Sequence, residues 1–287
     1  MDFNTNTTSY YVKEGVFWLP ELPEMEHYKR LLSEKLKGKK ITQVTITREK
    51  TINLSVEEFK NEVEGRAITA IERRAKHLVF HLDSGKGLLL HLMLGGLMYV
   101  GREKDSPNRT KQVTLSFGEI QLFFIGLRLG YLHLLTEEEL EEQLKDLGPE
   151  PLDPSYTLDE FQKSMSKRRG VLKTTLVNQK VLSGIGNLYS DEICFAAQLL
   201  PKRQMNELNP EETTMLYTSI QSVLKRGLTL GGYMDVPVYK EDRLTGGYND
   251  NCYVYDREGE PCPRCQAPII KEMISSRKTF YCLQCQY

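Results

Sequence analysis

The N-terminal half of the chain changes from a helical pattern to a strand pattern. Between residues 24 and 36, apolar side chains recur every three or four positions, which predicts a helix. Residues 41–135 instead contain short apolar runs bounded by Gly, Asp and Ser, a pattern typical of strands. The predicted strands are 41–46, 78–82, 88–92, 113–117 and 120–124. A series of such strands favours a sandwich or a barrel.

The C-terminal half returns to helical periodicity. Helices are predicted at 158–165, 171–179, 187–197 and 210–225. The proline-rich segment 147–154 precedes them and is typical of a stiff linker. Residues 231–251 follow them, and because they are rich in Gly, Tyr and Asp we expect a long polar loop.

These patterns together predict an α+β fold with several parts. We expect an N-terminal β-sandwich with flanking helices, a helical domain and a C-terminal β-hairpin. The predicted boundaries are an extension at 1–19, a sandwich domain at 20–135, a linker at 136–154, a helical domain at 155–250 and a cysteine-rich module at 251–287. The extension is expected to be disordered or to result from a misplaced start.

Composition places the chain among globular proteins. Hydrophobic residues make up 40% and charged residues 27% of 287 positions. No apolar run approaches the roughly 20 residues that a membrane span needs. The first eighteen residues are polar and lack the apolar core of a secretory signal, so we expect a cytoplasmic protein without a membrane partner.

The charge distribution is uneven although the formal net charge is only −1. A near-neutral chain argues weakly against nucleic-acid binding, because a basic excess is the usual sign of it. Residues 161–190, however, contain six basic residues and no acid. Such a run is most often a solvated face, but it also creates a local positive field.

Four of the six cysteines form two CxxC pairs near the C-terminus. They are Cys262, Cys265, Cys282 and Cys285, with sixteen residues between the pairs. This spacing predicts one structural Zn²⁺ held by four thiolates. Disulfides are the alternative, and the lack of a secretory signal disfavours them. Residues 268–281 between the pairs would form a small hairpin with Arg277 near its tip.

A glycine-rich turn at 183–189 lies between two predicted helices. Asn187 is placed as the N-cap of the second helix, and a helix N-terminus can bind an anion. Lys173 and Arg169 precede this turn, so the arrangement suits a nucleic-acid phosphate. The alternative is a plain corner between helices with a capping Asn.

Two further segments carry candidate residues. Lys76 follows two arginines just before an apolar strand, and it would project into a cleft toward a phosphate or a sugar. Leu94 lies in a glycine-containing turn after a strand, where an apolar side chain could act as a wedge between bases. The alternatives are solvated cations at a strand start and a leucine in the core.

The segment from Pro20 to Glu24 reads Pro-Glu-Leu-Pro-Glu. At a free N-terminus, the proline nitrogen is a secondary amine that can form an iminium with an aldehyde carbon. Inside a chain the same nitrogen is an amide and cannot act as a nucleophile. The chemistry open to Pro20 therefore depends on whether residues 1–19 are present in the mature protein.

Several motifs in one order resemble the formamidopyrimidine-DNA glycosylase family of helix–two-turn–helix DNA repair enzymes. They are PELPE at 20–24, RRAKHL at 73–78, LGPEPL at 147–152, GIGNLYSDE at 184–192, VYDREGEPCPRC at 254–265 and RKTFYCLQCQ at 277–286. The resemblance implies a helix–two-turn–helix domain, a zinc finger and a bifunctional glycosylase and abasic-site lyase. It also implies double-stranded DNA with oxidised bases or abasic sites as the partner, bound by a monomer associated with the bacterial nucleoid.

The resemblance assigns roles to individual residues. Pro20 would attack C1′ of a flipped nucleotide, Glu21 would act as general acid, and Lys76 and Arg277 would assist the two eliminations. Glu24 would help to shape the site. The residues implied in DNA binding are Leu94, Gln112, Arg128, Arg169, Lys173 and Asn187.

This sequence departs from the family pattern at four places. Leu94 replaces the usual wedge methionine, Gln112 replaces a DNA-contacting histidine, and Leu129 replaces an aromatic residue that stacks beside the base opposite the lesion. The loop at 231–251, where family members cap an oxidised purine, is a few residues longer than usual. These changes leave the lesion spectrum and the opposite-base preference open.

Two hypotheses account for the internal position of Pro20. In the first, translation begins at codon 19, because leucine codons TTG and CTG can act as bacterial initiators. The segment Lys13-Glu14-Gly15 can then be encoded by a purine-rich ribosome-binding sequence. In the second, the extension is real and the protein is a non-catalytic relative that binds damaged DNA.

A zinc-ribbon adaptor that contacts protein is a third function, from another class. An adaptor would need neither Glu21, Lys76 nor Arg277. We therefore favour a DNA repair glycosylase that removes oxidised purines, such as 8-oxoguanine and formamidopyrimidines, and then cleaves the abasic site by β,δ-elimination.

Overall fold

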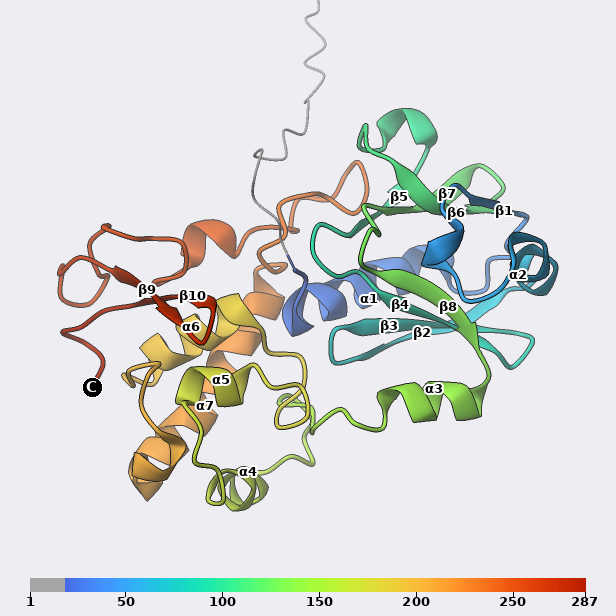
Figure 1. The fold of residues 1–287 in the computed structure, drawn as a ribbon. Coiled ribbons are helices and arrows are strands. Elements are labelled where there is room, and N and C mark those ends of the chain that lie inside the picture. The colour runs from blue at the N-terminus through green and yellow to red at the C-terminus, as the bar shows by residue number, and fades with distance from the viewer. Residues whose placement is uncertain (1–18) are drawn as a thin grey trace, which may run out of the picture.

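The computed structural model describes residues 19–287, so the segment Lys13-Glu14-Gly15 and nearly all of the predicted extension lie outside the described residues. Figure 1 shows a β-sandwich beside a mainly helical part that carries a small C-terminal hairpin. The strands are β1 (Gln43–Ile46), β2 (Ile68–Arg74), β3 (His77–Leu82), β4 (Gly87–His91), β5 (Leu97–Gly101), β6 (Lys111–Phe117), β7 (Ile120–Ile125), β8 (Tyr131–Leu135), β9 (Ile270–Ile274) and β10 (Arg277–Tyr281). The α-helices are α1 (Leu22–Leu36), α2 (Val56–Val63), α3 (Glu137–Leu144), α4 (Leu158–Met165), α5 (Leu172–Leu176), α6 (Asn187–Ala196) and α7 (Pro210–Thr229).

The sandwich consists of two four-stranded antiparallel sheets. Their strand orders are β1-β6-β7-β5 and β2-β3-β4-β8. Apolar side chains of both sheets fill the space between them, as where the rings of Phe80 on β3 and Phe124 on β7 meet edge to face with centroids 6.1 Å apart. This burial is the main force that holds the two sheets together.

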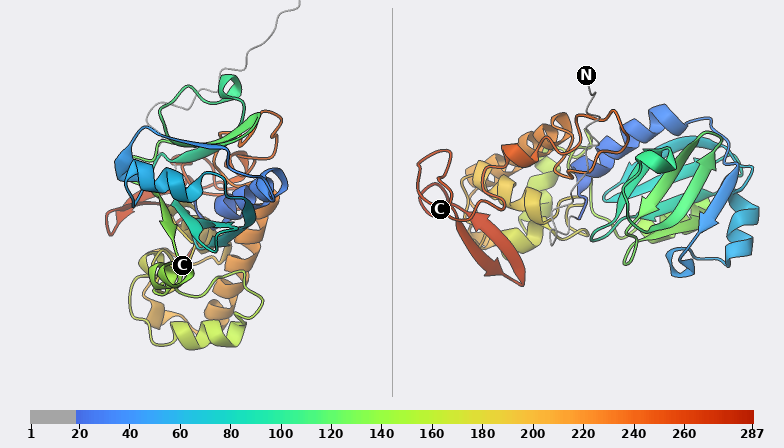
Figure 2. Two further views of the ribbon diagram at one scale, coloured as in Figure 1. Left: turned by 90° about the vertical axis from the view of Figure 1, so that its right-hand side faces the viewer. Right: turned by 90° about the horizontal axis from the view of Figure 1, so that it is seen from above.

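Helix α1 connects the sandwich to the helical part. It packs against β2 and β3 of the sandwich and against α7 of the helical part, and Figure 2 shows its N-terminal end where the two parts of the molecule meet. Its buried apolar residues belong to the same core cluster as those of α6 and α7. The residues that precede α1 are therefore set at the junction of the two domains.

The predicted architecture is confirmed, with three differences. Strands β2, β5 and β8 and helices α2 and α3 were not predicted. Helix α3 lies within the predicted linker and packs through Leu140 against Val79 and Leu89 of the sandwich. Helix α5 ends at Leu176, several residues earlier than predicted. Within the described residues, no helix is both long and apolar enough to span a membrane.

Candidate active site

Pro20 and Glu21 lie immediately before α1, at the domain junction. Both are buried, and the N–H of Leu22 donates to the carbonyl of Gly184 in the helical domain, at 2.9 Å. The nitrogen of Pro20 is bonded to the carbonyl carbon of Leu19. The oxygen of that carbonyl accepts a hydrogen bond from the hydroxyl of Tyr233.

The carboxylate of Glu21 binds the N-terminus of α6. It accepts hydrogen bonds from the N–H groups of Gly186, at 2.5 Å, and Leu188, at 2.9 Å. These donors have no partner within the helix, and the helix dipole adds positive potential there. Burial nevertheless raises the pKa of Glu21, while Lys76 opposes the shift. A carboxyl group with a raised pKa can hold a proton that a general acid needs.

The N-cap of α6 differs from the one predicted. Gly186 occupies that position and Asn187 is the first helical residue. A Cβ atom on Gly186 would lie 2.4 Å from Cδ of Glu21 and 2.5 Å from Nζ of Lys76. Only glycine at position 186 therefore leaves room for the carboxylate of Glu21 and the ammonium of Lys76 at the N-terminus of α6. The sequence suggested that this helix end would bind a phosphate.

Glu24 lies one turn further along α1 and is fully buried. Its carboxylate accepts from the Tyr189 hydroxyl at 2.7 Å, from the Tyr233 N–H at 2.9 Å and from the Glu21 N–H at 2.9 Å. Burial, followed by the neighbouring carboxylate of Glu21, raises the pKa of Glu24 to about 7. Glu24 thus joins α1 to α6 and to the 231–251 loop.

Lys76 is presented by a tight turn. Arg74 of β2 pairs with His77 of β3, so Ala75 and Lys76 alone form the turn of this hairpin. Ala75 has a φ of 53°, in the left-handed region. Burial lowers the pKa of Lys76, the carboxylates of Glu21 and Glu24 oppose the shift, and the charge of Arg277 lowers it further. An ammonium with a lowered pKa can exchange protons more readily near neutral pH.

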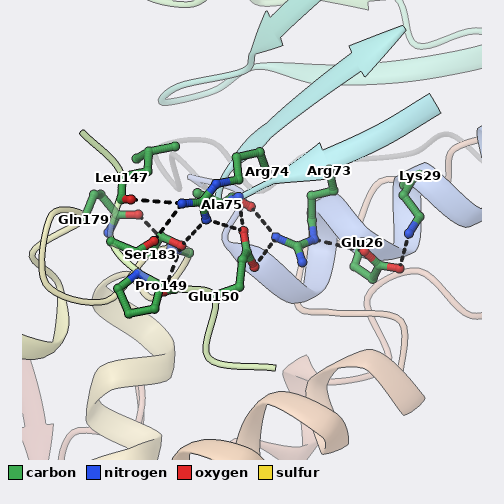
Figure 3. Close-up of polar contacts among 12 residues, drawn as sticks. Glu26, Lys29, Arg73, Arg74, Ala75, Leu147, Pro149, Glu150, Gln179 and Ser183 are labelled. Atoms are coloured by element: carbon green, nitrogen blue, oxygen red, sulfur yellow. Dashed lines mark hydrogen bonds and ion pairs between the residues drawn. The ribbon is translucent and has the colours of Figure 1, made fainter. Parts of the chain in front are cut away.

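The arginines next to Lys76 bind the linker instead of facing solvent (Figure 3). Glu150 accepts from Arg73 at 2.7 Å, from Arg74 at 3.0 Å and from the N–H of Ala75 at 2.5 Å. Arg74 also donates to the carbonyl of Leu147 and to the hydroxyl of Ser183. These bonds connect the hairpin, the linker and the turn before α6, and thereby hold Lys76 at the domain junction.

Lys173 does not lie where a phosphate could reach it. It is fully buried, and its ammonium donates to Asp191 at 2.6 Å and to the carbonyl of Asn187 at 2.8 Å. The expectation that Lys173 contacts the DNA backbone does not agree with this geometry. The lysine instead joins α5 to the first residues of α6.

Asn187 binds the C-terminal hairpin next to Arg277 in the chain. The side-chain amide of Asn187 donates to the carbonyl of Lys278 at 2.9 Å. The N–H of Phe280 donates to the buried carboxylate of Asp191 at 3.0 Å. Arg277 is exposed at the start of β10, close enough to Lys76 to affect its pKa. The hairpin is therefore fixed to α6, and the charge of Arg277 acts on Lys76.

Three other predicted DNA-binding residues gather at the edge of the sandwich. Leu94, Gln112 and Arg128 line one surface cavity of about 300 Å³. The side chain of Leu94 is 43% exposed, so it is not a core residue. Gln112 is buried and accepts from the N–H of Leu127 at 3.0 Å.

Arg109 lines the same cavity and was not predicted. Its guanidinium donates to the carbonyl of Gly95, at 3.0 Å, beside the wedge candidate Leu94. Arg169 lies apart from this group, exposed on the segment between α4 and α5. It belongs to the basic run that the sequence singled out.

The four C-terminal cysteines form one cluster. The Sγ atoms of Cys262 and Cys285 are 3.8 Å apart, and those of Cys265 and Cys282 are 3.5 Å apart. A tetrahedral Zn²⁺ with Zn–S bonds of about 2.3 Å places its sulfurs about 3.8 Å from one another. The cluster fits one structural zinc ion. Four thiolates leave no open position on the metal for catalysis.

The 231–251 loop was predicted to be polar, but several of its apolar and aromatic side chains are buried against neighbouring elements. Tyr233, Val238 and Tyr248 are buried, and Val238 accepts from the N–H of Val100 on β5 at 2.7 Å. The side chains of His27 and Thr245 are hydrogen-bonded at 2.9 Å. The loop therefore contacts the sandwich and α1 as well as its own domain.

Three family models match successive parts of the chain. They are described as the formamidopyrimidine-DNA glycosylase N-terminal domain, at 19–131, the H2TH domain of the same enzyme, at 147–235, and a zinc finger found in FPG and IleRS, at 259–286. The formamidopyrimidine-DNA glycosylase of Listeria innocua is 33% identical over 273 residues, which cover 93% of this chain and 100% of that protein. The chain belongs to the formamidopyrimidine-DNA glycosylase family.

Other family members agree in sequence and in structure. The glycosylase of Pelotomaculum thermopropionicum is also 33% identical, over 93% of this chain and 99% of its own length. The Lactococcus lactis Fpg bound to DNA with an abasic site superposes with a TM-score of 0.86 and 29% identity, over 93% of this chain and 99% of that one. A complex of the same enzyme with N7-benzyl-Fapy-dG DNA gives a TM-score of 0.85. As in this family, the chain is a bifunctional DNA glycosylase and abasic-site lyase.

Proposed function

We propose that this glycosylase excises oxidised purines, including 8-oxoguanine and formamidopyrimidines, from duplex DNA and cleaves the abasic site by β,δ-elimination. The observation that carries the proposal is that Glu21, next to Pro20 in the chain, and Lys76 both lie at the N-terminus of α6. A proline nitrogen freed from Leu19, a carboxyl with a raised pKa and an ammonium with a lowered pKa are the groups that iminium chemistry at a sugar needs.

The order of events follows from these groups. The nitrogen of Pro20, when free, attacks C1′ of the extruded nucleotide and displaces the base. Glu21 gives a proton to the sugar oxygen as the ring opens. Lys76 assists the first elimination and Arg277, from the zinc hairpin, assists the second.

The phosphate backbone would be held mainly by exposed residues on both domains. Arg128 and Arg169 are exposed cations, and Leu94 is an exposed apolar side chain suited to fill the gap in the stack. Gln112, Lys173 and Asn187 would act by fixing these surfaces, because their side chains are bonded within the protein.

The decisive experiment compares the full chain with a chain that starts at Pro20. This shorter chain keeps all the described helices and strands and has about the length of the family members it matches. We expect borohydride to trap it covalently on DNA that contains a formamidopyrimidine, while the full chain binds but is not trapped. Absence of trapping by the Pro20 chain would contradict the proposal.

A second candidate is a non-catalytic protein that binds damaged DNA. The bond between Leu19 and Pro20 favours it, because this nitrogen is an amide in the full chain. The intact mass of the protein made from its native gene separates the two: a mass for Pro20–Tyr287 supports the enzyme, and a mass that includes residues 1–19 supports the binding protein. In either form we propose a monomer in the bacterial cytoplasm, associated with the nucleoid.

A further inference from the structure

The bond between Leu19 and Pro20 marks the place of the sugar in the covalent intermediate. An amide nitrogen is planar, and its bond to the carbonyl carbon is about 1.33 Å long with partial double-bond character. In the covalent intermediate that precedes ring opening, the same nitrogen is bonded to C1′, which still carries the ring oxygen O4′. The carbonyl carbon of Leu19 therefore stands in for C1′. Its oxygen stands in for an oxygen attached to C1′, which in the nucleotide is the ring oxygen O4′.

The hydroxyl of Tyr233 donates to this stand-in oxygen. Tyr233 follows Gly232 in the loop after α7, and its side chain is 3% exposed. Burial raises the pKa of this tyrosine, and so do the charges of Glu21, just before α1, and of Glu24 on α1. The phenol thus keeps its proton throughout the pH range of the reaction and acts as a hydrogen-bond donor.

The position of this hydroxyl is set by the backbone and by a neighbouring ring. The N–H of Tyr233 donates to Glu24 at 2.9 Å, and its ring meets that of Tyr189 edge to face with centroids 6.0 Å apart. Gly232 has a φ of 73°, and a Cβ atom there would lie 2.5 Å from the Glu24 carboxylate. Such fixed donors stabilise developing charge because they need no reorganisation during the reaction.

We propose that Tyr233 is a further catalytic residue of this glycosylase, donating a hydrogen bond to O4′ as the sugar ring opens. The inference rests on the proposed role of Pro20. The base leaves with the proton of the Pro20 amine. The lone pair that this frees on the Pro20 nitrogen forms the C1′=N double bond, and the C1′–O4′ bond breaks with its electron pair moving to O4′. The proton that O4′ gains comes from Glu21, while Tyr233 keeps its own.

The test uses the chain that starts at Pro20, with Tyr233→Phe as the variant. Tyr217→Phe is the matched control, because its hydroxyl binds the carbonyl of Tyr156 away from the site. The rate of borohydride trapping on formamidopyrimidine DNA is measured in single turnover. We expect Tyr233→Phe to slow trapping about 100-fold, as for the loss of one preorganised donor to an oxyanion. Binding to DNA with a tetrahydrofuran abasic analogue should change less than threefold.

A substrate with sulfur at the 4′ position sharpens the test. Sulfur is a weak hydrogen-bond acceptor, so the unaltered Pro20 chain and Tyr233→Phe should process this substrate at similar rates. Equal trapping rates of both proteins on the ordinary substrate would overturn the role of Tyr233 alone. No trapping by the unaltered Pro20 chain would overturn the role of Pro20, and that of Tyr233 with it.

Discussion

Lys173 and Asp191 form an ion pair of 2.6 Å in which both side chains are completely buried. The other oxygen of Asp191 accepts from the N–H of Phe280 on β10. One carboxylate therefore joins α5, α6 and the zinc hairpin. Lys173, which the sequence suggested as a phosphate ligand, instead stabilises the packing of α5, α6 and the zinc hairpin.

Replacing Lys173 with Met should destabilise the fold by about 3–5 kcal/mol, because Asp191 would be left buried without its partner. Urea unfolding measures this change. Lys180→Met is the control, since the pair of Lys180 with Asp146 is exposed and its loss should not change stability measurably. If Lys173→Met kept normal stability but bound DNA more weakly, Lys173 would have to contact a phosphate directly, and its structural role would be contradicted.

Arg169→Ala should weaken DNA binding equally for damaged and undamaged duplexes, because phosphate contacts carry no base information. Arg169 is exposed on the basic segment between α4 and α5. We expect the slope of log affinity against log salt to fall by about 1, as for the loss of one phosphate contact. Fluorescence anisotropy between low and moderate salt measures the slope. A loss confined to one lesion would contradict this assignment.

Glu24 should make the folded state less stable as pH rises. Its pKa in the folded protein is about 7, raised by burial from an ordinary value of 4.5. The folded state therefore holds a proton that the unfolded state has lost between these values, so the stabilisation is complete below pH 4.5 and is lost as pH rises through 7.

Glu24→Gln should remove part of this pH dependence in urea unfolding between pH 5 and 8. Glu26→Gln is the control, because hydrogen bonds to Lys29 and Arg73 keep the pKa of Glu26 below its ordinary value despite partial burial. The stability that Glu26 contributes is lost only at lower pH, as that group becomes protonated. If the free energy of unfolding had the same pH dependence in Glu24→Gln and in the unaltered chain, Glu24 would not be protonated in the folded state near neutral pH.

Removal of zinc should unfold the C-terminal module and displace Arg277. Cys282→Ser takes away one of four thiolates whose sulfurs lie within 4.8 Å of one another. In the chain that starts at Pro20 we expect one zinc per molecule by elemental analysis. Its Cys282→Ser variant should lose both the metal and the second elimination. Cys194→Ala, which changes a buried cysteine outside the cluster, should keep the zinc.

The elements with regular periodicity could be predicted from the sequence. Helix α4 has the predicted bounds, and the cysteine spacing led directly to the cluster. Strand β2 was missed because it ends in Glu72, Arg73 and Arg74, whose charges hide its alternation. These charges are tolerated because Glu150 in the linker neutralises both arginines, and that contact spans more than seventy positions.

The catalytic candidates were located by motif, but their surroundings were not. The sequence around a lysine does not show whether its side chain is buried or exposed. The buried ion pair of Lys173 with Asp191 could therefore not be predicted from the neighbouring residues. Tyr233 lay in a segment that was expected to be a polar loop. Its position depends on the hydrogen bond from its N–H to the carboxylate of Glu24, more than two hundred residues earlier, and no sequence periodicity predicts such a contact.

Glu150 also bears on what the linker contributes to the enzyme. A proline-rich connection usually acts as a spacer, and its length decides how far two domains stand apart. Here Glu150 is bonded to the β2–β3 hairpin, and the carbonyl of Pro149 accepts from Ser183 of the helical domain at 3.0 Å. Residues inserted outside the segment 149–150 would lengthen the linker without moving the two domains apart. The spacing of the domains is set by the hydrogen bonds of Pro149 and Glu150, and not by the number of residues that join them.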